Sequence, residues 1–266
     1  MMRPLADWTV ADRARVAVLL TDIDDTLSTH GRLTAQAYAA VETLSAAGVQ
    51  VVPITGRPAG WCDHIARFWP VAGVVGENGA LWMRYDLSSR KLIKRFLHSD
   101  EERRAARDRF ASIAQRIMAA VPGCAIASDQ LYRESDLAID WCEDVVPLPR
   151  REVDRIVALM HDEGMTAKVS SIHVNGWFGD YDKLGMTRRF VAEALRMDLD
   201  HDSDRFAFVG DSPNDAPMFA FFANSVGVAN VRRFEDALEA KPRYVTRAES
   251  GAGFAEVAHA LLAARG

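Results

Sequence analysis

The stretch 16–27, VAVLLTDIDDTL, joins a continuous apolar run to three carboxylates. An apolar run without alternation is typical of a strand that is covered on both faces. Asp22, Asp24 and Asp25 follow where such a strand would end, and in an open parallel sheet ligand sites form at that carboxyl edge. Neighbouring carboxylates repel one another, so a divalent metal such as magnesium is expected beside them. The alternative is a solvated acidic turn.

The composition of the chain is that of an ordinary globular protein. Its 266 residues are 49% hydrophobic and 26% charged, which allows one large domain or a domain with an insert. The net charge of -5 does not indicate a nucleic-acid partner. No apolar stretch approaches the roughly 20 residues of a membrane helix, and the N-terminus does not resemble a secretory signal. Three widely spaced cysteines favour reduced thiols, so we expect a cytoplasmic protein with no membrane or nucleic-acid partner, of undetermined oligomeric state.

Strands and helices alternate in the first and last parts of the chain. The first part predicts strands at 16–20, 49–54 and 71–75, separated by helices at 34–47 and 59–69. The last part predicts helices at 183–196, 216–222 and 254–264, and strands at 205–209, 225–228 and 243–246. This rhythm predicts an α/β core with a doubly wound, Rossmann-like parallel sheet.

The middle of the chain has a different rhythm. Two hairpin-like strands at 80–85 and 91–97 precede a long helix that begins with the capping box Ser99–Glu102. Candidate strands at 124–127, 137–141 and 167–174 surround a second amphipathic helix at 150–163. We therefore expect residues 81–178 to form an inserted α+β domain, and residues 1–80 and 179–266 to form the core.

The acidic residues at the strand ends suit phosphoryl chemistry. Asp22 and Asp24 are two residues apart, which in a strand places them on the same side. One carboxylate can attack phosphorus to give an aspartyl phosphate, and a second can protonate the leaving alcohol and then activate water. Asp211 and Asp215 follow another predicted strand, where they can meet Asp22 at one cation. Arg57 and Lys183 can neutralise the transferred phosphoryl group.

Four segments occur in the order found in haloacid dehalogenase superfamily phosphatases: TDIDDT at 21–26, ITGR at 54–57, DK at 182–183 and GDSPNDAPM at 210–218. The chain resembles the group of that superfamily whose cap is inserted between the second and third motifs, which includes Cof-type and sugar-phosphate phosphatases. GDSPND is also similar to mannosyl-phosphoglycerate phosphatases, although the second motif here is TGR. Asp25 departs from the first motif, because it stands where glycine is commoner.

The resemblance implies a role for each matched residue. Asp22 would be the nucleophile and a metal ligand, and Asp24 would be the general acid and base, with its backbone carbonyl on the metal. Thr55 and Lys183 would bind the phosphoryl group. Three further roles are implied: magnesium binding by Asp211, direct or water-mediated magnesium binding by Asp215, and positioning of Lys183 or the phosphate by Asn214.

The inserted domain is expected to act as a lid that determines the substrate. His173 lies near the return from insert to core, and it is a substrate candidate together with Arg57 and Asn78. Structural roles compete with each assignment. Buried hydrogen bonds would explain Arg57 and Asn78, and a core position would explain His173. The remaining alternatives are a helix cap for Thr55, a solvated surface for Lys183 and a helix-terminal charge for Asp215.

The sequence thus predicts a magnesium-dependent phosphomonoester hydrolase that acts on a small phosphorylated metabolite, such as a sugar phosphate, through a phospho-aspartate. A phosphomutase of the same superfamily would return the phosphoryl group to a sugar instead of to water. A non-catalytic, phosphate-responsive module similar to a receiver domain would leave the long insert unexplained. A binding protein without turnover would not need every acid that the chemistry uses.

Overall fold

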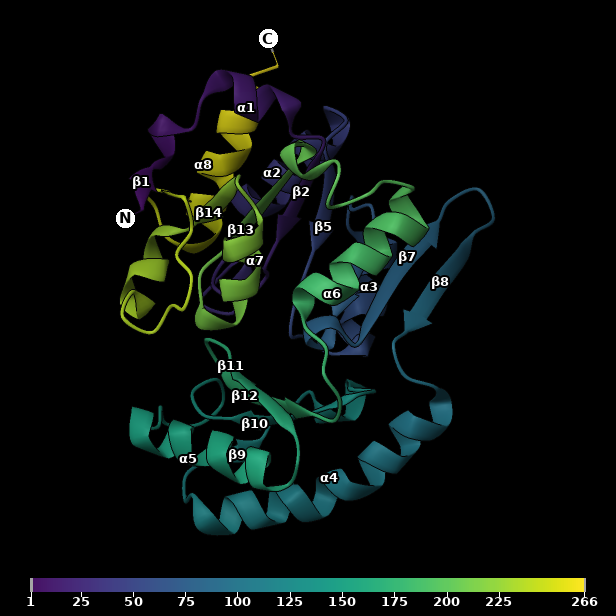
Figure 1. The fold of residues 1–266 in the computed structure, drawn as a ribbon, viewed down its shortest axis with the longest axis vertical. Helices are drawn as coiled ribbons and strands as arrows, with labels where there is room; N and C mark the ends of the chain where they lie inside the picture. Colours follow the sequence, from purple (N-terminus) through teal and green to yellow (C-terminus); the bar gives the residue numbers. More distant parts are fainter. Residues whose placement is uncertain (1, 266) are drawn as a thin grey trace.

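A computed structural model describes residues 2–265 of the chain. Its central sheet has six strands, all parallel, in the order β1-β15-β14-β13-β2-β5 (Figure 1). Their bounds in that order are Arg3–Pro4, Tyr244–Val245, Ser225–Gly227, Phe206–Gly210, Val18–Thr21 and Gln50–Pro53. The predicted α/β core with a parallel sheet is confirmed.

Strand β2 lies inside this sheet, and both of its faces are buried. Leu19 belongs to one apolar cluster and Leu20 to another, on opposite faces of the sheet. In the neighbouring strands, Val51 shares the cluster of Leu19 and Phe208 shares that of Leu20. Burial on two sides explains why the sequence of β2 is continuously apolar.

Helices cover both faces of the sheet. The cluster of Leu19 contains apolar side chains of α2 (Ala35–Ala46), α3 (Ala59–Phe68) and α8 (Ser250–Leu262). The cluster of Leu20 contains side chains of α6 (Lys183–Phe190) and α7 (Ala216–Phe221). Helix α1 (Val10–Arg15) lies beside α8 (Figure 1). Within residues 2–265, no helix combines the length and the apolar character that a membrane span requires.

The hairpin at 81–96 belongs with the core, which differs from the predicted domain boundary. Strand β7 (Leu81–Asp86) pairs antiparallel with both β6 (Val74–Gly76) and β8 (Lys91–Phe96). Its Trp82 ring meets Phe190 of α6 edge-on, with ring centroids 5.6 Å apart. A hairpin pattern shows two paired strands but does not show which sheet they join, so the sequence placed the boundary too early. We use "the insert" below for residues 98–178.

The insert contains a four-stranded antiparallel sheet with two helices on the side away from the core (Figure 1). The strand order is β11 (Thr166–Val169), β12 (His173–Trp177), β10 (Asp136–Asp140) and β9 (Ala125–Ile126). The helices are α4 (Asp100–Ala120), which begins at the predicted capping box, and α5 (Arg150–Asp162). Alternation along β10 and β12 turns Leu137 and Val174 toward the helices. The opposite face carries Asp136, Asp140, His173 and Asn175, so a buried polar surface faces the core.

Glu77 and Arg133 join the core to the insert. Glu77 is fully buried, and its carboxylate accepts hydrogen bonds from the backbone N–H groups of Ala59, Glu134 and Ser135 at 2.8, 2.9 and 2.6 Å. The Arg133 guanidinium donates to the carbonyl of Gly56 at 2.9 Å. The segment around Gly56, which precedes α3, is therefore connected directly to the insert.

Replacing Glu77 with Gln is expected to lower the free energy of unfolding by about 2 kcal/mol, because an amide nitrogen cannot accept a backbone N–H bond and one buried donor loses its partner. Urea denaturation followed by circular dichroism measures the change. Glu42→Gln, on the exposed face of α2, is the matched control and should change stability by less than about 0.5 kcal/mol. Equal effects of the two substitutions would contradict the anchoring role of Glu77.

Candidate active site

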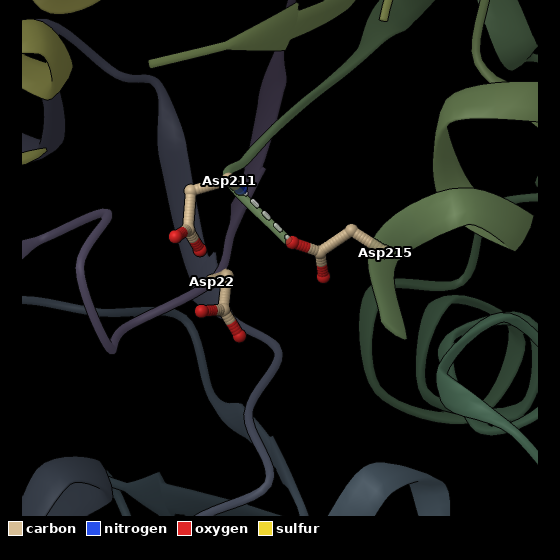
Figure 2. Close-up of side chains that lie close together, drawn as sticks. All are labelled: Asp22, Asp211 and Asp215. Atoms are coloured by element: carbon tan, nitrogen blue, oxygen red, sulfur yellow. Dashed lines mark hydrogen bonds between the residues drawn. The ribbon is translucent and has the colours of Figure 1, made fainter. Parts of the chain in front are cut away.

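Three buried carboxylates meet at the carboxyl edge of the central sheet (Figure 2). Asp22 follows β2, Asp211 follows β13, and Asp215 ends the 3₁₀ turn Pro213–Asp215. Strands β2 and β13 are paired neighbours, so their ends lie side by side. Each carboxylate offers an oxygen within 4.8 Å of the others, and none is more than 4% exposed. This convergence matches the arrangement predicted for one shared cation.

Neighbouring donors orient two of these carboxylates. Asp211 accepts hydrogen bonds from the Thr26 hydroxyl at 3.2 Å and from the Asn230 amide at 3.0 Å. Asp215 accepts from the backbone N–H groups of Asp211 at 3.1 Å and Ser212 at 3.3 Å. Sequence reasoning did not identify Asn230 as a site residue, because it belongs to none of the four matched segments.

Lys183, the first residue of α6, lies inside the acidic cluster. Its Nζ is 2.7 Å from Asp22 Oδ1 and 2.7 Å from Asp215 Oδ1, and the side chain is only 2% exposed. The alternative of a solvated lysine is therefore wrong. One ammonium faces three carboxylates, which leaves an excess of negative charge. Burial, reinforced by Asp215 and Asp24, raises the pKa of Asp22 to about 8 against the opposing effect of Lys183, and burial also raises the pKa of Asp211. A divalent cation would offset this excess, so the cluster fits a metal.

The carboxylate of Asp24 is bound to an arginine outside the cluster. Arg57 Nε donates to both Asp24 oxygens, at 2.9 and 3.0 Å, and Nη2 lies 2.8 Å from Oδ1. The arginine is 4% exposed and lies over the ring of Trp61, with 4.4 Å between its Cζ atom and the ring centroid. Arg57 thus holds a group that was predicted to act as acid and base.

Thr55 and Asn78 form the turn that precedes Arg57. The Thr55 hydroxyl accepts a hydrogen bond from the Arg57 N–H at 3.0 Å, and Thr55 itself is fully buried. Asn78 has a left-handed backbone with φ of 54°, and its N–H donates to the Thr55 carbonyl at 3.1 Å. Its side chain lies against Gly56, and a Cβ atom added at Gly56 would be only 3.1 Å from the side-chain nitrogen of Asn78. These contacts agree with the structural alternative given for Asn78, and its assignment as a substrate contact stays a prediction.

A small cavity, with about 10 Å³ of accessible space, lies between the core and the insert. Core residues on its wall include Asp22, Asp24, Arg57 and Asn214, the last of which accepts a hydrogen bond from the Ser212 hydroxyl at 2.7 Å. The insert contributes residues 170–173 and Asn175, from the turn between β11 and β12 and from β12. His173 lines this cavity and is only 2% exposed, and its role as a substrate contact stays a prediction.

Glu143 is a site residue that sequence reasoning missed. One oxygen of its carboxylate is 2.6 Å from Arg57 Nη2, and the other is 2.9 Å from His173 Nε2. It lies in an irregular segment between β10 and α5, where no motif or periodic pattern distinguishes one acid from the next. Only the position of the insert on the core brings Glu143 to this place.

Comparisons with known proteins agree with this geometry. The model of the haloacid dehalogenase-like hydrolase family matches residues 19–122. A curated relative, phosphoglycolate phosphatase of Pyrobaculum neutrophilum, is 28% identical over 248 residues, which are 92% of this chain and 95% of the relative. A HAD/COF-like hydrolase from Plasmodium vivax is 16% identical, with a TM-score of 0.68 over 96% of this chain and 99% of that one. Sucrose-phosphatase from Synechocystis is also 16% identical, with a TM-score of 0.60 over 91% and 97%.

The likeness to the two solved structures shows a shared fold. The matches to the family model and to the curated relative are similarities of amino-acid sequence. The family match includes the segment TDIDDT, whose first aspartate reaches the acidic cluster. The remaining matched segments supply Arg57, Lys183 and the two other clustered aspartates. Sequence order, fold and site agree, and the chain is similar to the haloacid dehalogenase-like hydrolases over the matched residues 19–122.

Proposed function

We propose that this protein is a magnesium-dependent phosphomonoester hydrolase in which Asp22 is the nucleophile. The observation that supports this most directly is the position of Asp22, with Lys183 at 2.7 Å and two further carboxylates within 4.8 Å. A carboxylate next to a fixed cation and a metal-binding cluster suits attack on a charged phosphoryl group. Phosphatase-named relatives at 28% identity agree with this class of reaction.

Each residue around Asp22 has a part in the proposed reaction. Asp22 attacks phosphorus and forms an aspartyl phosphate, while Asp24 donates a proton to the leaving oxygen. Asp24 then takes a proton from the water that hydrolyses the intermediate. Magnesium, held by the acidic cluster and the backbone carbonyl of Asp24, would supply charge compensation for the phosphoryl oxygens. Phosphoryl binding is assigned to Thr55, Lys183 and Asn214.

The insert acts as a lid in this proposal. Its polar sheet face and the turn 170–173 lie on one side of the cavity, opposite the acidic core. A lid that closes over a bound phosphate ester excludes bulk water, so the aspartyl phosphate is protected until the positioned water attacks. Separation of the insert from the core would then be needed for substrate entry and product release.

The substrate is a small phosphorylated metabolite. The cavity of the closed form has about 10 Å³ of accessible space, enough for about one water molecule, so a phosphoester has to enter while the insert is displaced from the core. Motif similarity favours a sugar phosphate, whereas the relatives named phosphoglycolate phosphatase favour a phosphorylated acid.

Removal of magnesium tests the proposed function. The purified protein should release inorganic phosphate from p-nitrophenyl phosphate with added magnesium, and chelation with EDTA should lower that rate by at least about a hundredfold. Excess magnesium should restore the rate. Full activity in the presence of the chelator would contradict the metal assignment. Phosphate release from a sugar phosphate, without an isomeric sugar phosphate as product, distinguishes the hydrolase from a phosphomutase.

A further inference from the structure

The carboxylate of Glu143 occupies a position between two groups that bind anions. It lies 2.6 Å from Arg57 Nη2 and 2.9 Å from His173 Nε2. Arg57 and His173 are almost completely buried, whereas the Glu143 side chain is 25% exposed. Arg57 and His173 both line the cavity that contains Asp22, so the position of the Glu143 carboxylate borders the phosphoryl site.

The charges around Arg57 show that this position favours an anion. Arg57 already pairs with Asp24, and its Nη1 lies 3.4 Å from Asp129, yet a third carboxylate is bound. Burial opposes the charge on Glu143, but the contacts with His173 and Arg57 outweigh it and lower the pKa of Glu143 to about 2. A carboxylate at this position is therefore held in its ionised form.

The backbone of Glu143 is held in place, whereas its side chain has several rotatable bonds. Its N–H donates to Asp140 at 2.8 Å, and the N–H of Asp144 donates to the same carboxylate at 2.8 Å. The backbone is thus held by a buried residue of β10, and rotation about the side-chain bonds alone can withdraw the Glu143 carboxylate.

We propose that the substrate carries a carboxylate in addition to its phosphate, and that this carboxylate replaces Glu143 between Arg57 and His173. The exchange of one carboxylate for another leaves the charge beside Arg57 unchanged, so Asp24 keeps its partner. The substrate is then a small phosphorylated acid, and a neutral sugar phosphate lacks the group that this position binds. The inference rests on the proposed function, because it places the phosphate of the same ligand at Asp22.

Two phosphonates that cannot be hydrolysed test the proposal without turnover. The first, 3-phosphonopropionate, carries a carboxylate, and the second, propylphosphonate, has a methyl group in its place. Isothermal titration calorimetry with magnesium should show that the intact protein binds 3-phosphonopropionate at least about tenfold more tightly. Equal dissociation constants for the two compounds would overturn the inference.

Variants at the two ends of the contact give opposite expectations. Glu143→Gln removes the competing charge and should widen the ratio of the two dissociation constants by about tenfold, whereas His173→Asn should narrow it by about tenfold. Asp144→Asn is the matched control, because Asp144 is exposed in the same segment and accepts its hydrogen bond from Ser128. The control should leave the ratio unchanged.

A loss of affinity for 3-phosphonopropionate in Glu143→Gln would overturn the inference, because it would make Glu143 a direct ligand of the substrate. Failure of the proposed function gives a different result. In that case neither phosphonate binds, and p-nitrophenyl phosphate is not hydrolysed. If the aryl phosphate is hydrolysed and the two phosphonates bind equally, the hydrolase assignment stands and only the carboxylate position is wrong.

Discussion

Replacing Asp22 with Asn is expected to lower phosphate release from p-nitrophenyl phosphate by about ten-thousandfold or more, because the amide cannot form the aspartyl phosphate. The substitution preserves the shape of the side chain, and Lys183 keeps its 2.7 Å contact with Asp215. Initial rates at saturating magnesium measure the loss. A phosphate-release rate equal to that of the intact protein would show that another residue is the nucleophile.

The fold of this variant is expected to persist. Asparagine removes one of three mutually repelling buried carboxylates, so thermal unfolding should show a melting temperature no lower than that of the intact protein. Asp108→Asn, at an exposed position of α4, is the matched control and should keep full activity. Loss of activity together with loss of the circular dichroism spectrum would indicate unfolding, and the nucleophile assignment would then lose its support from this variant.

Replacing Lys183 with Met is expected to give the largest loss of stability, about 3–5 kcal/mol of unfolding free energy, because it leaves buried carboxylates without their cation. Lys183 is the residue that contacts both Asp22 and Asp215, and all three side chains are at most 6% exposed. Phosphate release should also fall by about a thousandfold, since the transferred phosphoryl group loses a fixed positive charge.

The loss of stability caused by Lys183→Met should increase as the pH rises. The pKa of Asp22 in the folded protein is about 8, above its ordinary value of 3.8, so this group destabilises the fold increasingly as the pH rises through that interval. Lys183 lowers the pKa of Asp22, and its removal raises that pKa further. The deficit relative to the intact protein should therefore be larger at about pH 8 than at about pH 5.

Urea denaturation in the presence of a chelator measures this deficit at both pH values. Lys91→Met, at an exposed position of β8, is the matched control for removal of a lysine and should change stability by less than about 0.5 kcal/mol. A deficit for Lys183→Met that is the same at both pH values would show that the buried carboxylates do not account for it.

Much of the core could be predicted from local patterns along the chain. The apolar run before Asp22 predicted a strand that is buried on both faces, and Thr34 and Ser99 marked where α2 and α4 begin. The same patterns predicted that the acids after β2 and β13 would meet, because parallel strands end at one edge of a sheet. These features depend on the period and the ends of single segments, which the residues themselves specify.

Other features depend on which segments become neighbours. The hairpin 81–96 could join either sheet, and its pairing with β6 placed it in the core. Likewise, Arg57 and Glu143 are far apart in the sequence, and their contact exists because the insert lies over the carboxyl edge of the core sheet. The amino-acid sequence by itself thus determined the sheet and its acidic edge. Only the tertiary structure decided which residue contacts Arg57, because contacts between distant segments depend on how the insert is placed on the core.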